Sequence, residues 1–306
     1  MSKILVATEK PFSKAAVAKI KETTEQAGME LALLEKYTEK SQLLEAVQDA
    51  DAVIIRSDII DAEVLSAAKN LKIVVRAGAG YDNVDLAAAS DNNVVVMNTP
   101  GQNSNAVAEL ALGMMVYLCR NGFNGTAGTE LRGKTIGIHA YGYVGKLVAE
   151  IAKGFGMTVH AFDPFVDDAA IEKDGVIPEA SVEDLYSKCK VISLHIPAND
   201  KTKESINFDL MNKMPEGAML VNTARKEVIH EDSLIKMFKE RGDFKYASDI
   251  APTNKEEVAG IAEGRYFFTP KKMGAQTAEA NLNAGVAAVN QIIGFLNDGD
   301  ETFKVN

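Results

Sequence analysis

Residues 135–163 read TIGIHAYGYVGKLVAEIAKGFGMTVHAFD. A β-branched run is followed by a glycine-containing turn, a segment with helical periodicity and a second short β-rich run that ends in Asp163. This order is typical of a βαβ unit in a parallel sheet. The turn reads AYGYVG over 140–145, which is the G-x-G-x-x-G spacing with alanine in the first place.

The turn and the acidic residue that follows it predict a dinucleotide site. In such a turn the second glycine lets the backbone approach a pyrophosphate, and the third lets the helix pack closely on the strand; Gly142 and Gly145 occupy these places. Tyr143 and Val144 begin the helix, whose first amides favour an anion. Asp163 follows Gly145 by 18 residues, where an acidic residue binds a ribose 2′-hydroxyl and repels a 2′-phosphate. NAD is therefore favoured over NADP, and an ordinary βα turn is the alternative.

Short β-branched runs alternate with helical segments along the whole chain and fall into two series. Five strands are predicted in the first series, at 4–8, 29–33, 52–55, 73–76 and 94–97. Six are predicted in the second series, at 135–139, 158–163, 191–195, 218–223, 246–249 and 266–269. A helix over 104–119 joins the two series, and a helix over 277–295 follows the second. The predicted fold class is α/β, with two doubly wound parallel-sheet domains.

The composition of the 306 residues is that of a globular protein, with 46% hydrophobic and 25% charged residues. A net charge of −10 argues against a nucleic-acid surface. No run of 18 apolar residues is present, so no membrane contact is expected, and two cysteines fit a cytoplasmic location. No two of the four histidines have metal-ligand spacing, so no metal is expected. His139 and His160 lie in predicted strands and are interpreted as core or edge residues.

Six further motifs follow one another along the chain. They are RAGAGYDNVD at 76–85, NTPGQN at 98–103, AEL at 108–110, HIP at 195–197, VNTAR at 221–225 and TP at 269–270. Together with the glycine turn they resemble the D-isomer-specific 2-hydroxyacid dehydrogenases, and in detail the short D-3-phosphoglycerate dehydrogenases that lack a regulatory domain. The resemblance covers nearly the full length of the chain.

The resemblance implies both the domain organisation and the activity. Residues 1–98 and 281–306 are expected to form a flavodoxin-like substrate domain, and residues 99–280 a Rossmann NAD-binding domain through which two subunits form a homodimer. The implied reaction is the NAD-dependent oxidation of D-3-phosphoglycerate, a small phosphorylated hydroxy acid, to 3-phosphohydroxypyruvate in serine biosynthesis. A glyoxylate or hydroxypyruvate reductase, or another D-2-hydroxyacid dehydrogenase, is the alternative within the family. A non-catalytic protein that senses NAD is the alternative of another class.

The resemblance also assigns the residues of the site. Arg225 is implied to hold the substrate carboxylate, which its planar guanidinium suits. Asp249 is implied to lie beside the nicotinamide carboxamide. Further cofactor contacts are implied for Ile196, Pro197 and Thr223, and substrate contacts for Ala77, Gly78, Ala79, Gly80 and Asn103.

A strand of the first series ends at Arg56 and Ser57, where the family places an arginine. These two residues are expected to bind the substrate phosphate, because a charge-assisted hydrogen bond to an anion is strong. Arg76 and Lys10 are the alternatives for this role.

The chain departs from the family at the catalytic base. Relatives use a histidine after Thr-Pro and a glutamate five residues beyond the nicotinamide aspartate, whereas this chain has Lys271-Lys272 and Asn254. One explanation is that catalysis has been lost. The other is a lysine base, since a carboxylate partner raises the pKa of a lysine away from neutrality and is absent here; the resemblance includes short members with such a lysine. Lys271 is favoured over Lys272, and Glu256 or Glu257 could restore a carboxylate.

Overall fold

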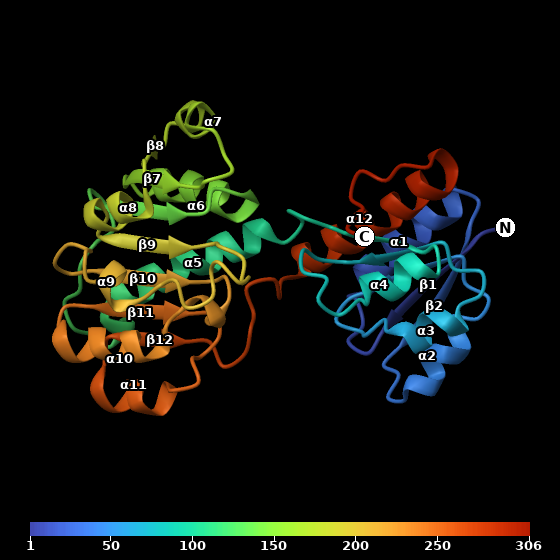
Figure 1. Ribbon diagram of the computed structural model, residues 1–306, viewed down its shortest axis with the longest axis horizontal. Coiled ribbons are helices and arrows are strands. Elements are labelled where there is room, and N and C mark those ends of the chain that lie inside the picture. The colour runs from blue at the N-terminus through green and yellow to red at the C-terminus, as the bar shows by residue number, and fades with distance from the viewer. The chain divides into compact units, whose positions relative to one another are not determined.

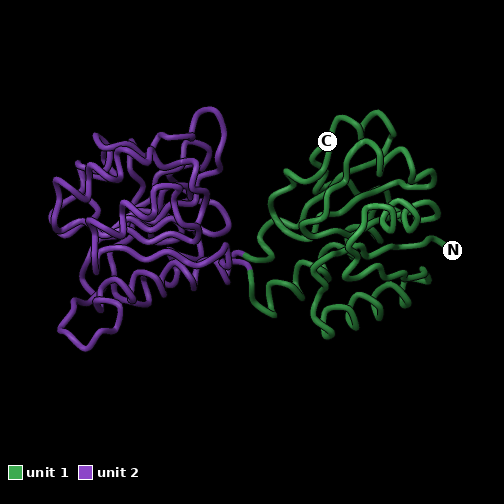
Figure 2. The backbone as a smooth tube through the Cα atoms, turned by 90° about the horizontal axis from the view of Figure 1, so that it is seen from below, with its two compact units in different colours: residues 1–103, 276–306 green, residues 104–275 purple.

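The computed structural model describes residues 1–306, and the chain divides into two compact units (Figures 1 and 2). Unit 1 comprises Met1–Asn103 and Gln276–Asn306, and Unit 2 comprises Ser104–Ala275. The junctions expected from the sequence, 98/99 and 280/281, each lie five residues from these divisions. The turn before the joining helix belongs to Unit 1, and so does the start of the last helix.

Unit 1 is built on a five-stranded parallel sheet with the order β2-β1-β3-β4-β5. Its strands are β1 (Lys3–Thr8), β2 (Glu30–Glu35), β3 (Ala52–Ile55), β4 (Ile73–Arg76) and β5 (Val95–Asn98). Its helices are α1 (Lys14–Gln26), α2 (Lys40–Ala46), α3 (Ala62–Ala67), α4 (Leu86–Asp91) and α12 (Ala278–Asp298). Ile54 faces α1 and α12, whereas its neighbours Val53 and Ile55 face α2 to α4. Strand residues alternate in this way because both faces of the sheet are covered.

The ends of the Unit 1 helices follow from local chemistry. Ser13 caps α1, its side chain accepting a hydrogen bond from Ala16 N at 3.2 Å. Gly28 follows this helix with a left-handed φ of 69°, which glycine adopts without steric cost. The last helix returns to Unit 1 and packs on α1, where a Cβ added at Gly285 would lie 2.9 Å from the side chain of Ile20.

Unit 2 contains a seven-stranded parallel sheet with the order β12-β11-β10-β9-β6-β7-β8. Its strands are β6 (Thr135–His139), β7 (Thr158–Phe162), β8 (Ile177–Pro178), β9 (Val191–Leu194), β10 (Met219–Asn222), β11 (Lys245–Ser248) and β12 (Tyr266–Phe268). Its helices are α5 (Ser104–Cys119), α6 (Tyr143–Gly154), α7 (Asp168–Lys173), α8 (Val182–Lys188), α9 (Phe208–Met211), α10 (Glu231–Glu240) and α11 (Lys255–Ile261). Two short 3-10 helices are η1 (Asn121–Phe123) and η2 (Lys226–Val228).

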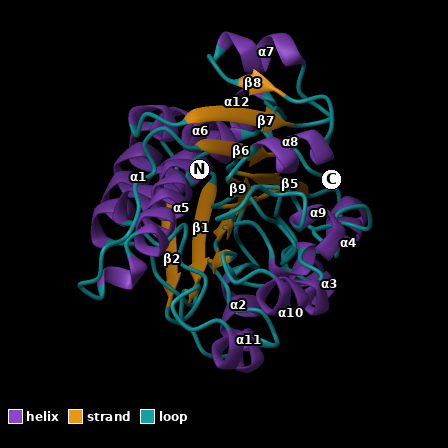
Figure 3. Cartoon of the chain, turned by 90° about the vertical axis from the view of Figure 1, so that its left-hand side faces the viewer, coloured by secondary structure: helices purple, strands orange, loops and turns teal.

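Helices cover both faces of the Unit 2 sheet (Figure 3). An apolar core lies on each face. One core lies against α5 and α6, and the other against α8 to α11. The sheet has seven strands rather than the six expected. The unpredicted strand is β8, which is only two residues long and therefore too short to show a strand pattern in the sequence. Five expected strands extend one residue too far, and the residues concerned are Asp163, His195, Thr223, Asp249 and Thr269. These polar residues lie just beyond the ladder, at the carboxyl edge where α/β folds bind ligands.

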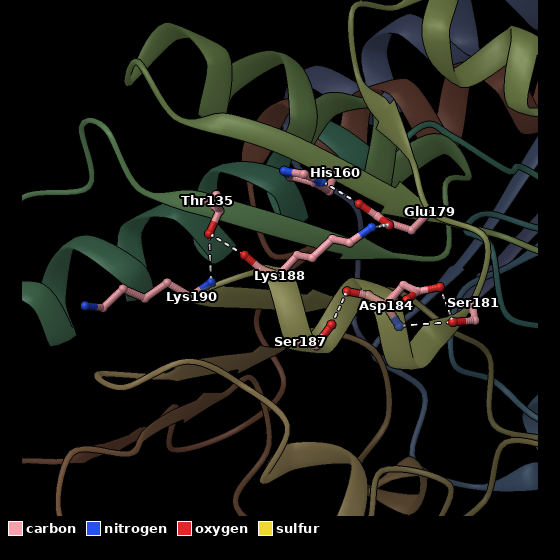
Figure 4. Close-up of polar contacts among 8 residues, drawn as sticks. All are labelled: Thr135, His160, Glu179, Ser181, Asp184, Ser187, Lys188 and Lys190. Carbon is pink, nitrogen blue, oxygen red and sulfur yellow. Dashed lines mark hydrogen bonds and ion pairs between the residues drawn. The ribbon is translucent and has the colours of Figure 1, made fainter.

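A buried carboxylate connects the strand that leads to Asp163 with its neighbours (Figure 4). The side chain of Glu179, which directly follows β8, is 3% exposed; its oxygens lie 2.7 Å from His160 Nδ1 and 2.5 Å from Lys188 Nζ. Thr135 Oγ1 accepts a hydrogen bond from Lys190 N at 2.9 Å and donates one to Lys188 O at 3.0 Å. The end of α8 is thereby attached to β6 and β7.

Candidate active site

The turn between β6 and α6 has the backbone that a dinucleotide needs. Ala140 adopts a left-handed φ of 79°, which costs a residue with a Cβ about 1–2 kcal/mol and explains why glycine usually stands there. A Cβ built on Gly142 would meet no atom within 4 Å, so this backbone is open to a ligand. A Cβ on Gly145 would lie 2.3 Å from Ala140 O, so only glycine allows the helix to pack this closely on the strand.

Asp163 lies beside this turn. Its Oδ2 accepts a hydrogen bond from Tyr141 N at 2.8 Å, and its Oδ1 accepts one from Phe165 N at 2.9 Å. A carboxylate has about four acceptor positions, so each oxygen can still accept a ribose hydroxyl. The first turn of α6, with exposed Tyr143 and part-buried Val144, has no side-chain cap, which leaves its amides for an anion. These residues fit NAD.

Two histidines lie where the strand order reverses, between β6 and β9. His195 N donates a hydrogen bond to His139 O at 2.9 Å. Burial lowers the pKa of His139 to about 4, against the opposing effect of Asp163, and burial together with His139 lowers the pKa of His195 to about 3. His195 Nε2 lies 2.9 Å from Ser193 Oγ, and its Nδ1 lies 3.5 Å from Thr223 Oγ1. Both rings are therefore neutral near pH 7 and act as fixed polar groups at the edge of the sheet.

Arg225 is presented by a turn at the end of β10. Asn222, which is 2% exposed, accepts a hydrogen bond from Ala224 N at 2.9 Å and donates one to Arg225 O at 2.9 Å. Part-buried Arg225 donates from Nη1 to Ala224 O at 3.0 Å. Asn222 is a site residue that the sequence did not predict. A polar residue at the end of the buried strand MLVN was the signal that could have identified it.

Asp249 lies at the end of β11 and is 3% exposed. Its Oδ1 accepts hydrogen bonds from Thr269 Oγ1 at 3.0 Å and from Met273 N at 2.9 Å, and its Oδ2 accepts one from Gly274 N at 2.7 Å. Exposed Lys271 and Lys272 lie between these contacts in the chain. The structure therefore brings the expected nicotinamide aspartate and the lysine pair to the same place.

The position of the missing glutamate is occupied by an amide. Asn254 Nδ2 donates to Glu231 O at 3.1 Å, and its buried Oδ1 has no hydrogen-bond partner. Glu256 and Glu257 are exposed on α11, where Glu257 pairs with a surface lysine at 3.0 Å. Glu231 instead reaches this loop, since its carboxylate accepts hydrogen bonds from the amide (2.8 Å) and hydroxyl of Thr253. No local motif marks Glu231, because it comes from a separate helix.

In Unit 1, the glycine loop after β4 is held by its own neighbours. Thr99 N donates to Gly78 O at 2.9 Å, and Asn98 Nδ2 donates to Ala79 O at 2.6 Å. Gly78 has a φ of 147°, and a Cβ there would fall 1.6 Å from Arg76 Nη1. Arg76 therefore lies directly across Gly78, while Ala77 is buried and Gly80 and Asn103 are part-buried.

Arg56 is more constrained than an exposed phosphate ligand. Its Nη1 donates to Lys10 O at 3.0 Å and Pro11 O at 3.2 Å, its Nη2 donates to Asn281 Oδ1, and its guanidinium lies 5.2 Å from the centre of the Phe12 ring. Burial lowers the pKa of Arg56. Three of the five guanidinium N–H groups have these partners. Ser57 and Lys10 are exposed.

Buried Asp58, two residues after Arg56, accepts hydrogen bonds from three segments of Unit 1. The donors are Glu9 N at 2.7 Å, Tyr37 Oη at 2.9 Å and Arg56 N at 3.1 Å.

No group of three or more histidine, cysteine, aspartate or glutamate side chains is arranged to hold a metal ion. No helix combines the length and the apolar character that crossing a membrane requires.

Comparisons with known proteins agree with this geometry. Residues 111–264 match the family model of the D-isomer specific 2-hydroxyacid dehydrogenase NAD binding domain. The chain is 33% identical to a hydroxypyruvate reductase from Thermotoga maritima over 86% of this chain and 90% of that protein. It is 32% identical to a D-3-phosphoglycerate dehydrogenase from Methanocaldococcus jannaschii over 83% of this chain, and it spans about half (51%) of that protein.

A solved structure is similar over the whole chain. It is a cofactor (NAD⁺) bound 3-phosphoglycerate dehydrogenase from Entamoeba histolytica, 48% identical, with a TM-score of 0.88 and coverage of 100% of this chain and 98% of that one. Identity at this level extends through both units. The chain therefore belongs to the D-isomer-specific 2-hydroxyacid dehydrogenases and is an NAD-dependent enzyme of that family.

Proposed function

We propose that the protein oxidises D-3-phosphoglycerate to 3-phosphohydroxypyruvate with NAD, in serine biosynthesis. The observation that carries this proposal is the 48% identity over the whole chain to a 3-phosphoglycerate dehydrogenase. The proposal includes Unit 1 as the substrate-binding domain, Unit 2 as the NAD-binding domain, and a cytoplasmic homodimer paired through Unit 2. A hydroxypyruvate reductase is the second candidate, because a protein of that name is 33% identical over most of both chains.

The reaction requires a cation for the carboxylate and a base for the hydroxyl proton. When bound, NAD supplies the hydride acceptor. Arg225 in Unit 2 holds the carboxylate, because one Nη1 bond to Ala224 O leaves other N–H groups of its fork for the substrate. In Unit 1, the loop 77–80 is the segment that the resemblance assigns to the substrate, and the side chain of Arg76 lies close against Gly78.

Lys271 is the proposed base, and it takes the proton from the C2 hydroxyl. Two observations support a lysine here. The amide of Asn254 replaces the carboxylate that would hold an ammonium in its charged form, and Glu256 and Glu257 are exposed on α11. Lys272 is the alternative base.

Phosphate recognition is assigned to Arg56 and Ser57. Two guanidinium N–H groups of Arg56 remain beyond the three with partners in Unit 1, and its half-buried position strengthens a charge-assisted bond. Arg76, which donates from Nε to Arg56 O at 2.9 Å, is the alternative.

The test of the substrate is NADH production from D-3-phosphoglycerate, D-glycerate and D-lactate under the same conditions. We expect the highest kcat/KM with D-3-phosphoglycerate. A preference for D-glycerate, or for reduction of hydroxypyruvate, favours the reductase. Turnover of none of these substrates would assign the enzyme to another D-2-hydroxy acid.

The test of the phosphate site is Arg56→Ala, with Lys69→Ala, which removes an exposed cation elsewhere in Unit 1, as the control. The first change should raise KM for D-3-phosphoglycerate by roughly tenfold or more, because a charged hydrogen bond contributes about 1.5–3 kcal/mol. Arg56 also donates hydrogen bonds to Lys10 O and Asn281 Oδ1, so its loss could destabilise Unit 1. A thermal unfolding curve measures that loss of stability, and the variant Arg56→Lys keeps the positive charge. An unchanged KM in stable Arg56→Ala protein moves the phosphate to Arg76 or Lys10.

A further inference from the structure

We infer that Asp249 is a positioning residue for the lysine-bearing loop Thr269–Gly274, and that its carboxylate acts on the reaction through Lys271. This inference rests on the proposed lysine base and adds to the cofactor role that the family resemblance implied. Asp249 binds both ends of the loop. The hydroxyl of Thr269 is held at the start of the loop, and the amides of Met273 and Gly274 are held at its end.

The clamp restricts the lysines because the loop between its anchors is short. Only Pro270, Lys271 and Lys272 separate Thr269 from Met273. Proline fixes its own φ and limits the conformations of its neighbours. A loop of three residues closed at both ends has few accessible backbone states, so the position of the lysine Cα atoms is set by the strand end that carries Asp249.

Gly274 gives an independent indication of the same contact. A Cβ added there would lie 2.9 Å from Asp249 Oδ2 and 3.3 Å from Val107 Cγ2, on α5. The position is buried, and the nearest obstacle is the carboxylate that its own amide binds. Glycine at this place therefore allows the backbone to approach Asp249 closely.

The coordination of Asp249 also limits what else it can do. Three donors occupy its two oxygens, and the residue is 3% exposed. A carboxylate offers about four acceptor positions, so about one remains for any further donor. The loop is therefore the main partner of this carboxylate.

The test perturbs the loop side of the clamp and leaves the carboxylate in place. Thr269→Val removes one donor, and Gly274→Ala introduces the close contact described above. Thr24→Val, which removes a buried hydroxyl with a 2.8 Å bond in Unit 1, and Gly113→Ala, which adds a methyl group where no atom lies within 4 Å, are the matched controls.

The first readout is independent of activity. In NAD-free protein, trypsin cleavage after Lys271 and Lys272, followed by mass spectrometry, reports how tightly the loop is held. We expect cleavage to be roughly tenfold faster in Thr269→Val and Gly274→Ala and unchanged in both controls. Equal cleavage in all four variants and the wild type would overturn the clamp, whatever the substrate is.

The second readout separates positioning from cofactor binding. A displaced base costs rate, so kcat should fall roughly ten- to a hundredfold in Thr269→Val and Gly274→Ala while the Kd for NAD changes less than threefold. A parallel loss of NAD affinity and kcat would overturn the inference in favour of a role at the nicotinamide alone. Faster cleavage with unchanged kcat would overturn the link to catalysis while the clamp itself stands. Full activity of Lys271→Met would instead remove the lysine base, which is a failure of the proposed function.

Discussion

Two aspartates directly follow parallel strands of the same sheet and differ in what they hold. Asp163, after β7, is part-buried and accepts two backbone amides, from Tyr141 and Phe165. Asp249, after β11, is 3% exposed and accepts three hydrogen bonds from the loop Thr269–Gly274. An acidic residue at a strand end can thus keep most of its acceptor positions for a ligand, or have most of them occupied by hydrogen bonds from the protein.

The difference arises from the neighbouring chain. Beside Asp163 stands a tight turn whose Gly142 is open on the cofactor side, so the carboxylate keeps capacity for ribose hydroxyls. Beside Asp249 stands a loop that is folded back on the carboxylate and buries it. We therefore expect changes near Asp163 to alter cofactor affinity and changes in the Asp249 loop to alter the chemical step.

The largest effect is expected for Lys271→Met, which tests the chemical half of this comparison. It should lower kcat by roughly 10²–10⁴ because loss of a general base falls on the proton-transfer step. The Kd for NAD, measured by titration, should stay within about twofold. A fully active variant would transfer the role to Lys272, and full activity of both single variants and the double variant would exclude a lysine base.

The second-largest difference is expected in the free energy of unfolding when each carboxylate is removed. Asp249→Ala leaves two buried donors without a partner, the hydroxyl of Thr269 and the amide of Gly274. Asp163→Ala leaves one, the amide of Tyr141, because Phe165 is exposed. Because an unsatisfied buried donor costs about 1–3 kcal/mol, the first change should lower the free energy of unfolding by roughly 1–3 kcal/mol more than the second. Urea unfolding of both variants measures this, and equal losses would show that the two carboxylates are equivalent.

The Asp163 side of the sheet also carries a pH dependence, because His139 ends the neighbouring strand β6. The pKa of His139 falls from about 6.5 when unfolded to about 4 when folded, because burial disfavours its charged form. Between these pH values the unfolded chain binds a proton that the folded chain does not, so stability decreases as pH falls from 6.5 to 4 and this loss is complete below 4.

His139→Leu should remove that loss. Relative to its own value at pH 7.5, the variant should retain on the order of 3 kcal/mol more of the free energy of unfolding than the wild type at pH 4. Chemical unfolding across this pH range is the measurement. Parallel pH profiles for the two proteins would mean that His139 is protonated equally easily in the folded and unfolded states.

Cofactor choice should show the smallest effect. The carboxylate of Asp163 stands where a 2′-phosphate would approach, and like charges in a half-desolvated site should disfavour NADP by roughly 1–3 kcal/mol. The wild type should therefore use NAD with higher kcat/KM than NADP. In Asp163→Ser, the ratio of kcat/KM with NAD to kcat/KM with NADP should be smaller than in the wild type. Comparable efficiency with both cofactors in the wild type would remove Asp163 from this role.

Much of this architecture follows from local patterns. Short apolar runs located all five strands of Unit 1 and six of the seven in Unit 2. Most of these strands are buried along their length, whereas β2 and β12 are only partly buried. The missed strand, β8, is two residues long and is held by Ala161 and Glu179 rather than by its own side chains. The expected strands extended one residue too far at Asp163 and Asp249 because a ladder ends where its partner turns away, which periodicity does not show.

The sequence by itself determined the two α/β series, the glycine turn with its following acid, and the unusual lysine pair, because spacing and residue type are local properties. Only the tertiary structure decided which donors reach each carboxylate. Thr269, Met273 and Gly274 lie 20 to 25 residues beyond Asp249, and they meet it because β11 and β12 pair in parallel register. Such a contact depends on strand pairing over a distance that no motif spans, so local patterns gave Asp249 no partner and only the family resemblance gave it a role, beside the nicotinamide.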